Sequence, residues 1–216
     1  MIYNIYLSVI ACAFLCSLIS FRLHYPFHLR LFSVLIGIAF LTEILAKFGL
    51  NILHLHSNYP VYSVYLLAQY LVYALYFKRI LEAAWLRNII NVFMVVLGIA
   101  WLFTTFFVFG VSVWNSYIIF LGDLFAIVMC CFYFYSIFSS DKLLDFRKSP
   151  EFWTAAGIFI YSCCEVPIAG VLNFMDINYP ALTMDLEIVL QMLNILMYII
   201  FIYAYVCPLL TNTTKS

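Results

Sequence analysis

Seven long apolar stretches dominate this sequence and are separated by short polar connections. Each has close to the ~20 residues that a helix needs to cross the hydrocarbon core of a bilayer. A segment in lipid must satisfy its own backbone hydrogen bonds, and these stretches are too long for the strands of a membrane barrel. The sequence therefore predicts an all-α integral membrane protein, a single seven-transmembrane-helix bundle over residues 1–216. The expected helices lie near Tyr3–Phe21, Leu31–Leu50, Val61–Leu81, Ile89–Phe109, Trp114–Phe138, Phe152–Leu172 and Thr183–Val206.

The low charge content supports the bilayer as the solvent of this chain. Only 9% of its residues are charged, whereas a soluble domain carries about 25%. So few charges cannot cover a water-facing surface, and seven spans leave no room for a separate soluble domain. The formal net charge is zero, which gives no support to a nucleic-acid partner. The expected partner is the lipid bilayer.

The basic residues indicate the orientation of the bundle. Lys and Arg accumulate at the first, third and fifth connections and in the C-terminal tail, and the other connections carry none. Because cytoplasmic loops are enriched in Lys and Arg, we expect the N-terminus outside and the C-terminus in the cytoplasm. The residues that carry this prediction are Arg22, Arg30, Lys78, Arg79, Arg87, Lys142, Arg147, Lys148 and Lys215.

A weak internal repeat relates the two halves of the chain. Gly-Ile at residues 37–38 and Asn-Tyr-Pro at residues 58–60 recur 120 residues later, at 157–158 and 178–180. This offset aligns the sequences of the second and third expected helices with those of the sixth and seventh, and the aligned helices cross the membrane in the same direction. The pattern indicates a parallel 3+1+3 repeat, in which the fourth helix is a linker. Parallel repeats of this kind occur in transporters.

Polar side chains inside the spans concentrate in their outer halves and come from five of the helices. An ionisable residue at the centre of a membrane helix costs at least ~2.5 kcal/mol, so such residues mark candidate functional sites. One acid and two amides, at positions 187, 191 and 194, follow one helical stripe in the last span. The candidate ligand-binding residues are Glu43, Lys47, Gln69, Asp123, Glu165, Glu187, Gln191 and Asn194.

Structural explanations compete with binding at several of these positions. Gln69, Gln191 and Asn194 could serve only as hydrogen-bonding contacts between helices. Glu43 and Lys47 have the i,i+4 spacing of a pair that neutralises itself. Asp123 and Glu165 have no basic residue within reach on their own helices, and this favours a functional role for both.

The sequence gives little support to metal or cofactor chemistry. His54 and His56 could bind a metal together with Asp176, all in expected outer loops, but loop histidines are more often simply solvated. We therefore predict no metal site. We also predict no cofactor, and no retinal in particular, because the last span has no lysine to form a Schiff base. Hydrolase and phosphate-loop motifs are absent, and their absence argues against an enzyme.

Several motifs resemble those of an uncharacterised family of small bacterial seven-transmembrane-helix membrane proteins. They are the Ser-Pro-Glu-Phe-Trp run at residues 149–153 with the Gly-Ile-Phe-Ile-Tyr run at 157–161, the Leu-Asn-Ile-Leu-Met-Tyr run at 193–198, Glu43, and Asn-Tyr-Pro at 58–60. The resemblance covers most of the chain in its layout. It implies a multi-pass protein of the bacterial cytoplasmic membrane and transfers no catalytic residue.

We therefore expect a receptor-like or sensory membrane protein, with a polar pocket in the outer half of the bundle that binds a small ligand or a proton from the periplasmic side. Short cytoplasmic loops imply that its output passes through a protein partner or a homodimer. A small-solute or ion transporter is the alternative. A second alternative is an intramembrane lipid-modifying enzyme, using either the histidine loop or acid–base chemistry by Asp123 and Glu165.

Overall fold

The computed structural model describes residues 2–52, 58–108, 115–139, 148–178 and 180–212, and in these ranges all regular structure is helical. Seven helical segments are long and apolar enough to cross a membrane, so the chain is a multi-pass membrane protein. The helices are α1 (Ile2–Ser17), α2 (Ile19–Arg22), α3 (Phe27–Ile52), α4 (Tyr59–Ile80), α5 (Ala84–Phe103), η1 (Thr104–Val108), α6 (Ser116–Phe138), α7 (Pro150–Asn178) and α8 (Pro180–Asn212).

The seven segments correspond to the seven predicted spans. The first combines α1 with the short α2, and the fourth continues α5 into the π-helical turn η1. The sixth span begins two residues before its expected start: α7 starts at Pro150, and the Phe152 backbone N–H donates to Ser149 Oγ at 3.3 Å. A serine cap followed by proline in the first turn is a common way to begin a helix.

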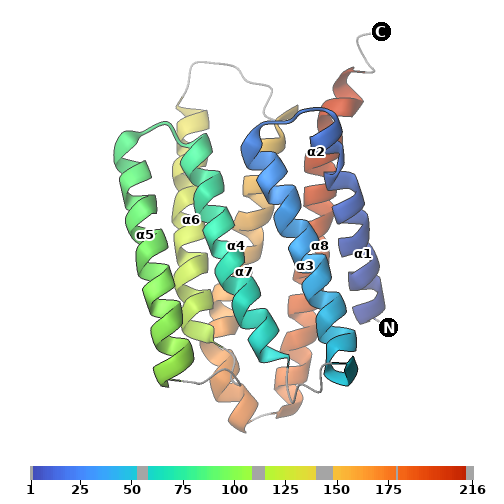
Figure 1. Cartoon of the computed structure of the whole chain (residues 1–216), viewed down its shortest axis with the longest axis vertical. Helices are drawn as coiled ribbons and strands as arrows, with labels where there is room; N and C mark the ends of the chain where they lie inside the picture. The colour runs from blue at the N-terminus through green and yellow to red at the C-terminus, as the bar shows by residue number, and fades with distance from the viewer. Residues whose placement is uncertain (1, 53–57, 109–114, 140–147, 179, 213–216) are drawn as a thin grey trace.

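Most of the spans form a closed ring. Going round it, α1 packs on α3, α3 on α4, α4 on α6, α6 on α7, α7 on α8, and α8 returns to α1 (Figure 1). The first and last spans are thus neighbours although they lie at opposite ends of the sequence. This closure brings residues from both halves of the chain to the centre of the bundle.

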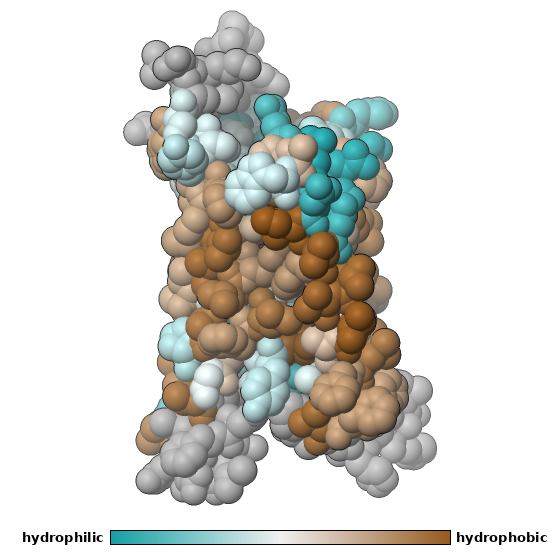
Figure 2. Space-filling model, turned by 90° about the vertical axis from the view of Figure 1, so that its left-hand side faces the viewer, coloured by the Kyte–Doolittle hydropathy of each residue, from teal (hydrophilic) through white to brown (hydrophobic). Residues whose placement is uncertain are grey.

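The α5 helix stands outside this ring. It packs on α4 and α6 at one side of the bundle (Figure 1), where the Trp101 Nε1–H donates to the Ser63 carbonyl at 2.9 Å. Its outer face exposes apolar side chains such as Val92 and Ile99, both about 62–63% accessible. Apolar side chains form a band around the middle of the face seen in Figure 2, as a lipid-facing surface requires.

Aromatic side chains fill the centre of the ring on the side toward the C-terminus. Phe32 packs edge-to-face on Phe201 with 4.9 Å between the ring centroids, and stacks on Tyr73 at 5.9 Å. We call this cluster the aromatic block, and each member is at most 2% accessible. Its residues are Phe32, Tyr73, Tyr76, Phe201 and Tyr205.

Glycines allow close helix contacts, and Gly122 and Gly157 are two examples. A Cβ built on Gly122 of α6 would lie 2.5 Å from ring atoms of Tyr70 on α4. A Cβ on Gly157 of α7 would lie 2.7 Å from the Phe201 ring on α8. Small residues let membrane helices approach closely, which replaces the hydrophobic driving force that is weak in lipid.

Candidate functional site

A cavity of about 550 Å³ lies inside the ring at the end opposite the aromatic block. It is bounded by the first turns of α1, the second half of α3, the first half of α4, the middle of α7, and α8 from Thr183 to Tyr198. Its described lining residues include seven tyrosines. They are Tyr3, Tyr6, Tyr59, Tyr62, Tyr65, Tyr161 and Tyr198.

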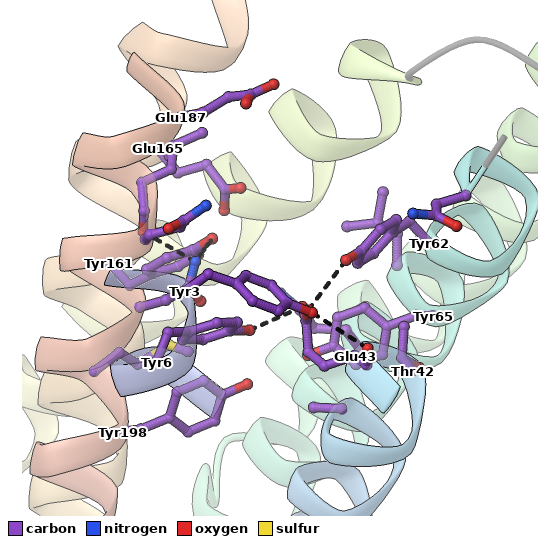
Figure 3. A pocket seen from close by; sticks show the side chains of 18 of the residues that line it. Tyr3, Tyr6, Thr42, Glu43, Tyr62, Tyr65, Tyr161, Glu165, Glu187 and Tyr198 are labelled. Atoms are coloured by element: carbon purple, nitrogen blue, oxygen red, sulfur yellow. Dashed lines mark hydrogen bonds between the residues drawn. The ribbon is translucent and has the colours of Figure 1, made fainter. Parts of the chain in front are cut away.

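Glu43 on α3 is held in one wall by three of these tyrosines. The Tyr6 hydroxyl donates to Glu43 Oε1 at 2.9 Å, while the Tyr3 and Tyr62 hydroxyls donate to Oε2, both at 3.2 Å. The donors come from α1 and α4, so the carboxyl group joins three helices at one point (Figure 3). Hydrogen bonds to a carboxylate are about twice as strong as neutral ones and stabilise its charge in a site that is largely removed from water.

Glu165 on α7 lies on the other side of the cavity, close to Tyr161 (Figure 3). Its carboxyl group lies within hydrogen-bonding range of the Tyr161 hydroxyl and of the Asp123 carboxyl group. The Tyr161 hydroxyl in turn accepts a hydrogen bond from Asn194 Nδ2 on α8 at 3.3 Å.

Asp123 on α6 sits behind Glu165 and is completely buried. Its Oδ1 accepts a hydrogen bond from Ser162 Oγ at 2.9 Å. Its Oδ2 and Glu165 Oε2 are buried and receive no hydrogen bond from a donor in the described part of the chain. Two carboxylates cannot both keep their charge in contact inside a low-dielectric interior. The pair is therefore stable when a single proton is shared between the two groups.

The structure brings together six of the eight residues expected in the pocket. Their side chains line one cavity, although Glu187 is exposed and marks its edge. A role in ligand binding stays a prediction for all of them. The six residues are Glu43, Gln69, Glu165, Glu187, Gln191 and Asn194.

The other two expected residues lie outside the wall. Asp123 is completely buried behind Glu165 and does not line the cavity. Lys47 is exposed at the end of its span, where its ammonium donates to Asn4 Oδ1 at 3.2 Å and lies 5.4 Å from the centroid of the Tyr3 ring.

Sequence reasoning missed the tyrosines as site residues. The stripe of Tyr62, Tyr65 and Gln69 on α4 was visible as a helical period, but tyrosine is also common at membrane interfaces. Tyr3 and Tyr6 are three residues apart and share a face of α1. No sequence signal, however, places that face against α3.

Metal chemistry finds no support in the part of the chain that the structure describes. No group of three or more His, Cys, Asp or Glu side chains within those ranges is arranged to hold an ion. The side chains of His54, His56 and Asp176 lie outside what the structure describes, so that metal hypothesis stays untested.

Comparison with known proteins adds no further information about the site. No known protein family, curated protein or solved structure matches this chain. The function must therefore be inferred from the cavity and its chemistry.

Proposed function

We propose that this chain is a receptor-like membrane protein that binds a small molecule in the tyrosine-lined cavity. The cavity itself is the observation that supports the proposal. Its volume of about 550 Å³ lies within the ~300–1,000 Å³ of typical small-molecule sites. Polar groups inside a membrane are costly, and a structural role alone would not require them to surround an open space.

The cavity opens toward the outside in the orientation that the basic residues favour. Exposed Glu187 and Tyr59, which is 39% accessible, bring its wall to the surface at the N-terminal end of the bundle. With the N-terminus outside, a ligand enters from the periplasm of a bacterial cytoplasmic membrane.

The aromatic block supports a receptor more than an open channel. It fills the ring beneath the cavity with rings that are almost fully buried. A bound molecule therefore meets a closed floor and can act only by changing how the helices pack. The short connections on the cytoplasmic side imply that the signal passes to a protein partner or to a second copy of the chain.

Cysteine labelling tests both the orientation and the access. Gln191→Cys, in the cavity wall, should react with a membrane-impermeant thiol reagent in intact cells. Ser139→Cys should react only after permeabilisation. Ser139 is exposed at the C-terminal end of α6, on the side of the bundle away from the cavity. The parent chain gives the background, since all seven of its cysteines lie within helices. Labelling of Ser139→Cys alone in intact cells would reverse the orientation, and no labelling of Gln191→Cys from either side would remove the cavity as an entry site.

A proton-coupled transporter is the second candidate, and the Asp123–Glu165 pair favours it. A carboxyl pair that shares one proton beside a cavity can exchange that proton when a substrate binds.

A second void of about 10 Å³ lies between the cavity and the aromatic block and shares Tyr65 and Tyr198 with the cavity wall. The position of α5 outside the ring agrees with the proposed 3+1+3 repeat, in which this helix is the linker. Substrate uptake driven by a proton gradient in vesicles would identify a transporter, and its absence would favour a receptor.

A further inference from the structure

The cavity wall carries several acidic groups and no basic group among its described lining residues. Glu43, Glu165 and Glu187 contribute three carboxyl groups, and no Lys, Arg or His is present among the described lining residues. An ionised carboxylate removed from water is costly unless a positive charge lies nearby. The electrostatics of this wall therefore favour a cationic ligand over an anionic or neutral one.

The polar atoms of the wall that have no hydrogen-bonding partner are acceptors, and each needs a donor. Two of its side-chain atoms are buried without a hydrogen-bonding partner in the described ranges, Glu165 Oε2 and Asn58 Oδ1. Both are acceptors, and Glu165 is only 6% accessible. An ammonium group carries three N–H donors and no acceptor, so it supplies what these atoms lack.

The tyrosine rings and the size of the cavity define the rest of the ligand. Aromatic faces attract ammonium groups when these lie within about 6 Å of the ring centroid. Lys47 already places its own ammonium 5.4 Å from the Tyr3 ring at this end of the bundle. A cavity of about 550 Å³ is far larger than a bare alkali ion and leaves room for an organic body.

We propose that the cavity binds a protonated primary amine, with the Glu165 carboxylate as the anionic anchor and the tyrosine rings around the organic body. This inference rests on the proposed receptor function and names the chemical class of its ligand. Glu43 is less suited as the anchor, because three tyrosine hydroxyls already occupy its oxygens. Glu165 Oε2 is buried beside the cavity and has no hydrogen-bond donor in the described ranges, so a small turn of the side chain toward a bound ammonium would satisfy it.

Matched amines and alcohols test the charge of the ligand directly. Purified protein would be titrated with cadaverine and 2-phenylethylamine, and with their neutral counterparts 1,5-pentanediol and 2-phenylethanol, at constant NaCl. Thermal unfolding and saturation-transfer NMR of the probe would both be followed. At least one amine should raise the unfolding midpoint and show saturation transfer, and its alcohol should do neither.

Variants at two acids identify the anchor. Glu165→Gln keeps the shape of the side chain and should weaken amine binding about 30-fold or more, because it removes the buried partner of a charge. Glu82→Gln changes an exposed acid between α4 and α5 and should bind the amine like the parent. The NMR signal reports binding without unfolding, so a loss in Glu165→Gln can be separated from a stability defect.

Several outcomes would overturn the amine assignment. Equal effects of an amine and its alcohol would mean that charge is not recognised. A rise of the unfolding midpoint in a separate titration with NaCl alone would point to an inorganic ion, and no response to either amine would reject the class. In each case Gln191→Cys could still react from outside, which would leave the proposed receptor function standing. A cavity closed to the thiol reagent would remove both proposals together.

Discussion

Replacing Gly122 with alanine tests the packing that separates α4 from α6. The added methyl group would lie 2.5 Å from three atoms of the Tyr70 ring. Ordinary van der Waals contacts of a Cβ lie at 3.4–4 Å, so the ring must retreat by about 1 Å. Tyr70 is fully buried, donates its hydroxyl to the Ile119 carbonyl at 3.3 Å and packs edge-to-face on Tyr73. Its burial, its hydroxyl bond and its contact with Tyr73 all oppose that movement.

The expected loss of stability follows from this geometry. Overpacking a well-filled core costs about 1–3 kcal/mol, and the rigid surroundings of Tyr70 place Gly122→Ala in the upper part of that range. The higher helix propensity of alanine than of glycine offsets this loss of stability by up to about 1 kcal/mol. We therefore expect the free energy of unfolding to fall by about 2 kcal/mol, which corresponds to a drop of roughly 4–8 °C in the melting temperature of a protein of this size.

Gly98→Ala is the matched control. A Cβ at Gly98, on α5, meets no heavy atom within 4 Å, so this variant should be neutral or more stable than the parent. Melting would be followed by intrinsic fluorescence in the same detergent. Equal melting temperatures for Gly122→Ala and Gly98→Ala would refute the tight contact between Gly122 and Tyr70.

Three further substitutions test the polar contacts, each by the free energy of unfolding. Glu43→Ala should lower it by about 2–4 kcal/mol, because three tyrosine hydroxyls lose their charged acceptor. Asn115→Ala should lower it by about 1–2 kcal/mol, because the side chain caps α6 and donates to Thr104 Oγ1 at 2.7 Å. Asp123→Asn should leave it unchanged or raise it by up to about 1 kcal/mol, because the amide can donate to Glu165 without a shared proton.

Exposed residues of the same type provide the controls. Glu82→Ala and Asn88→Ala should each change the free energy of unfolding by less than about 0.5 kcal/mol. A Glu43→Ala variant as stable as Glu82→Ala would contradict the tyrosine cluster, and an Asn115→Ala variant as stable as Asn88→Ala would contradict the cap. A large loss in Asp123→Asn would contradict the shared proton.

The spans could be predicted from the sequence because lipid imposes a strong length and polarity requirement. A run such as Trp114–Phe138 has few other ways to satisfy its backbone, and α6 indeed covers Ser116–Phe138. The last two helices extend past their predicted ends, since α7 and α8 continue to Asn178 and Asn212. Polar residues can remain helical beyond the apolar core, and hydropathy alone does not detect them.

The grouping of the polar residues could be predicted in part. Helical stripes correctly associated Glu187, Gln191 and Asn194, since spacing within one helix fixes a common face. Contacts between helices are not encoded in that spacing. The positions of Asp123 behind Glu165 and of Tyr6 against Glu43 depend on how far each helix rotates in the ring.

Glu43 and Lys47 contact different partners, although their i,i+4 spacing had suggested that they pair with each other. Glu43 turns inward to the hydroxyls of α1 and α4, whereas Lys47 reaches Asn4 and the Tyr3 ring near the bundle surface. Long lysine side chains near the end of a membrane helix extend toward water. The glutamate side chain is too short to extend to water in this way, so its carboxylate depends on hydrogen-bond donors at the same depth in the membrane.

The place of α5 beside the ring affects how the sequence can change over evolutionary time. None of the described residues that enclose the cavity belongs to this helix. Its outward face can therefore drift among apolar residues, or lengthen to match a thicker bilayer, without altering the binding site. A saturation mutagenesis screen of the whole chain should show this as one tolerant span next to intolerant ones, with the contact of Trp101 to α4 as a sensitive position within it.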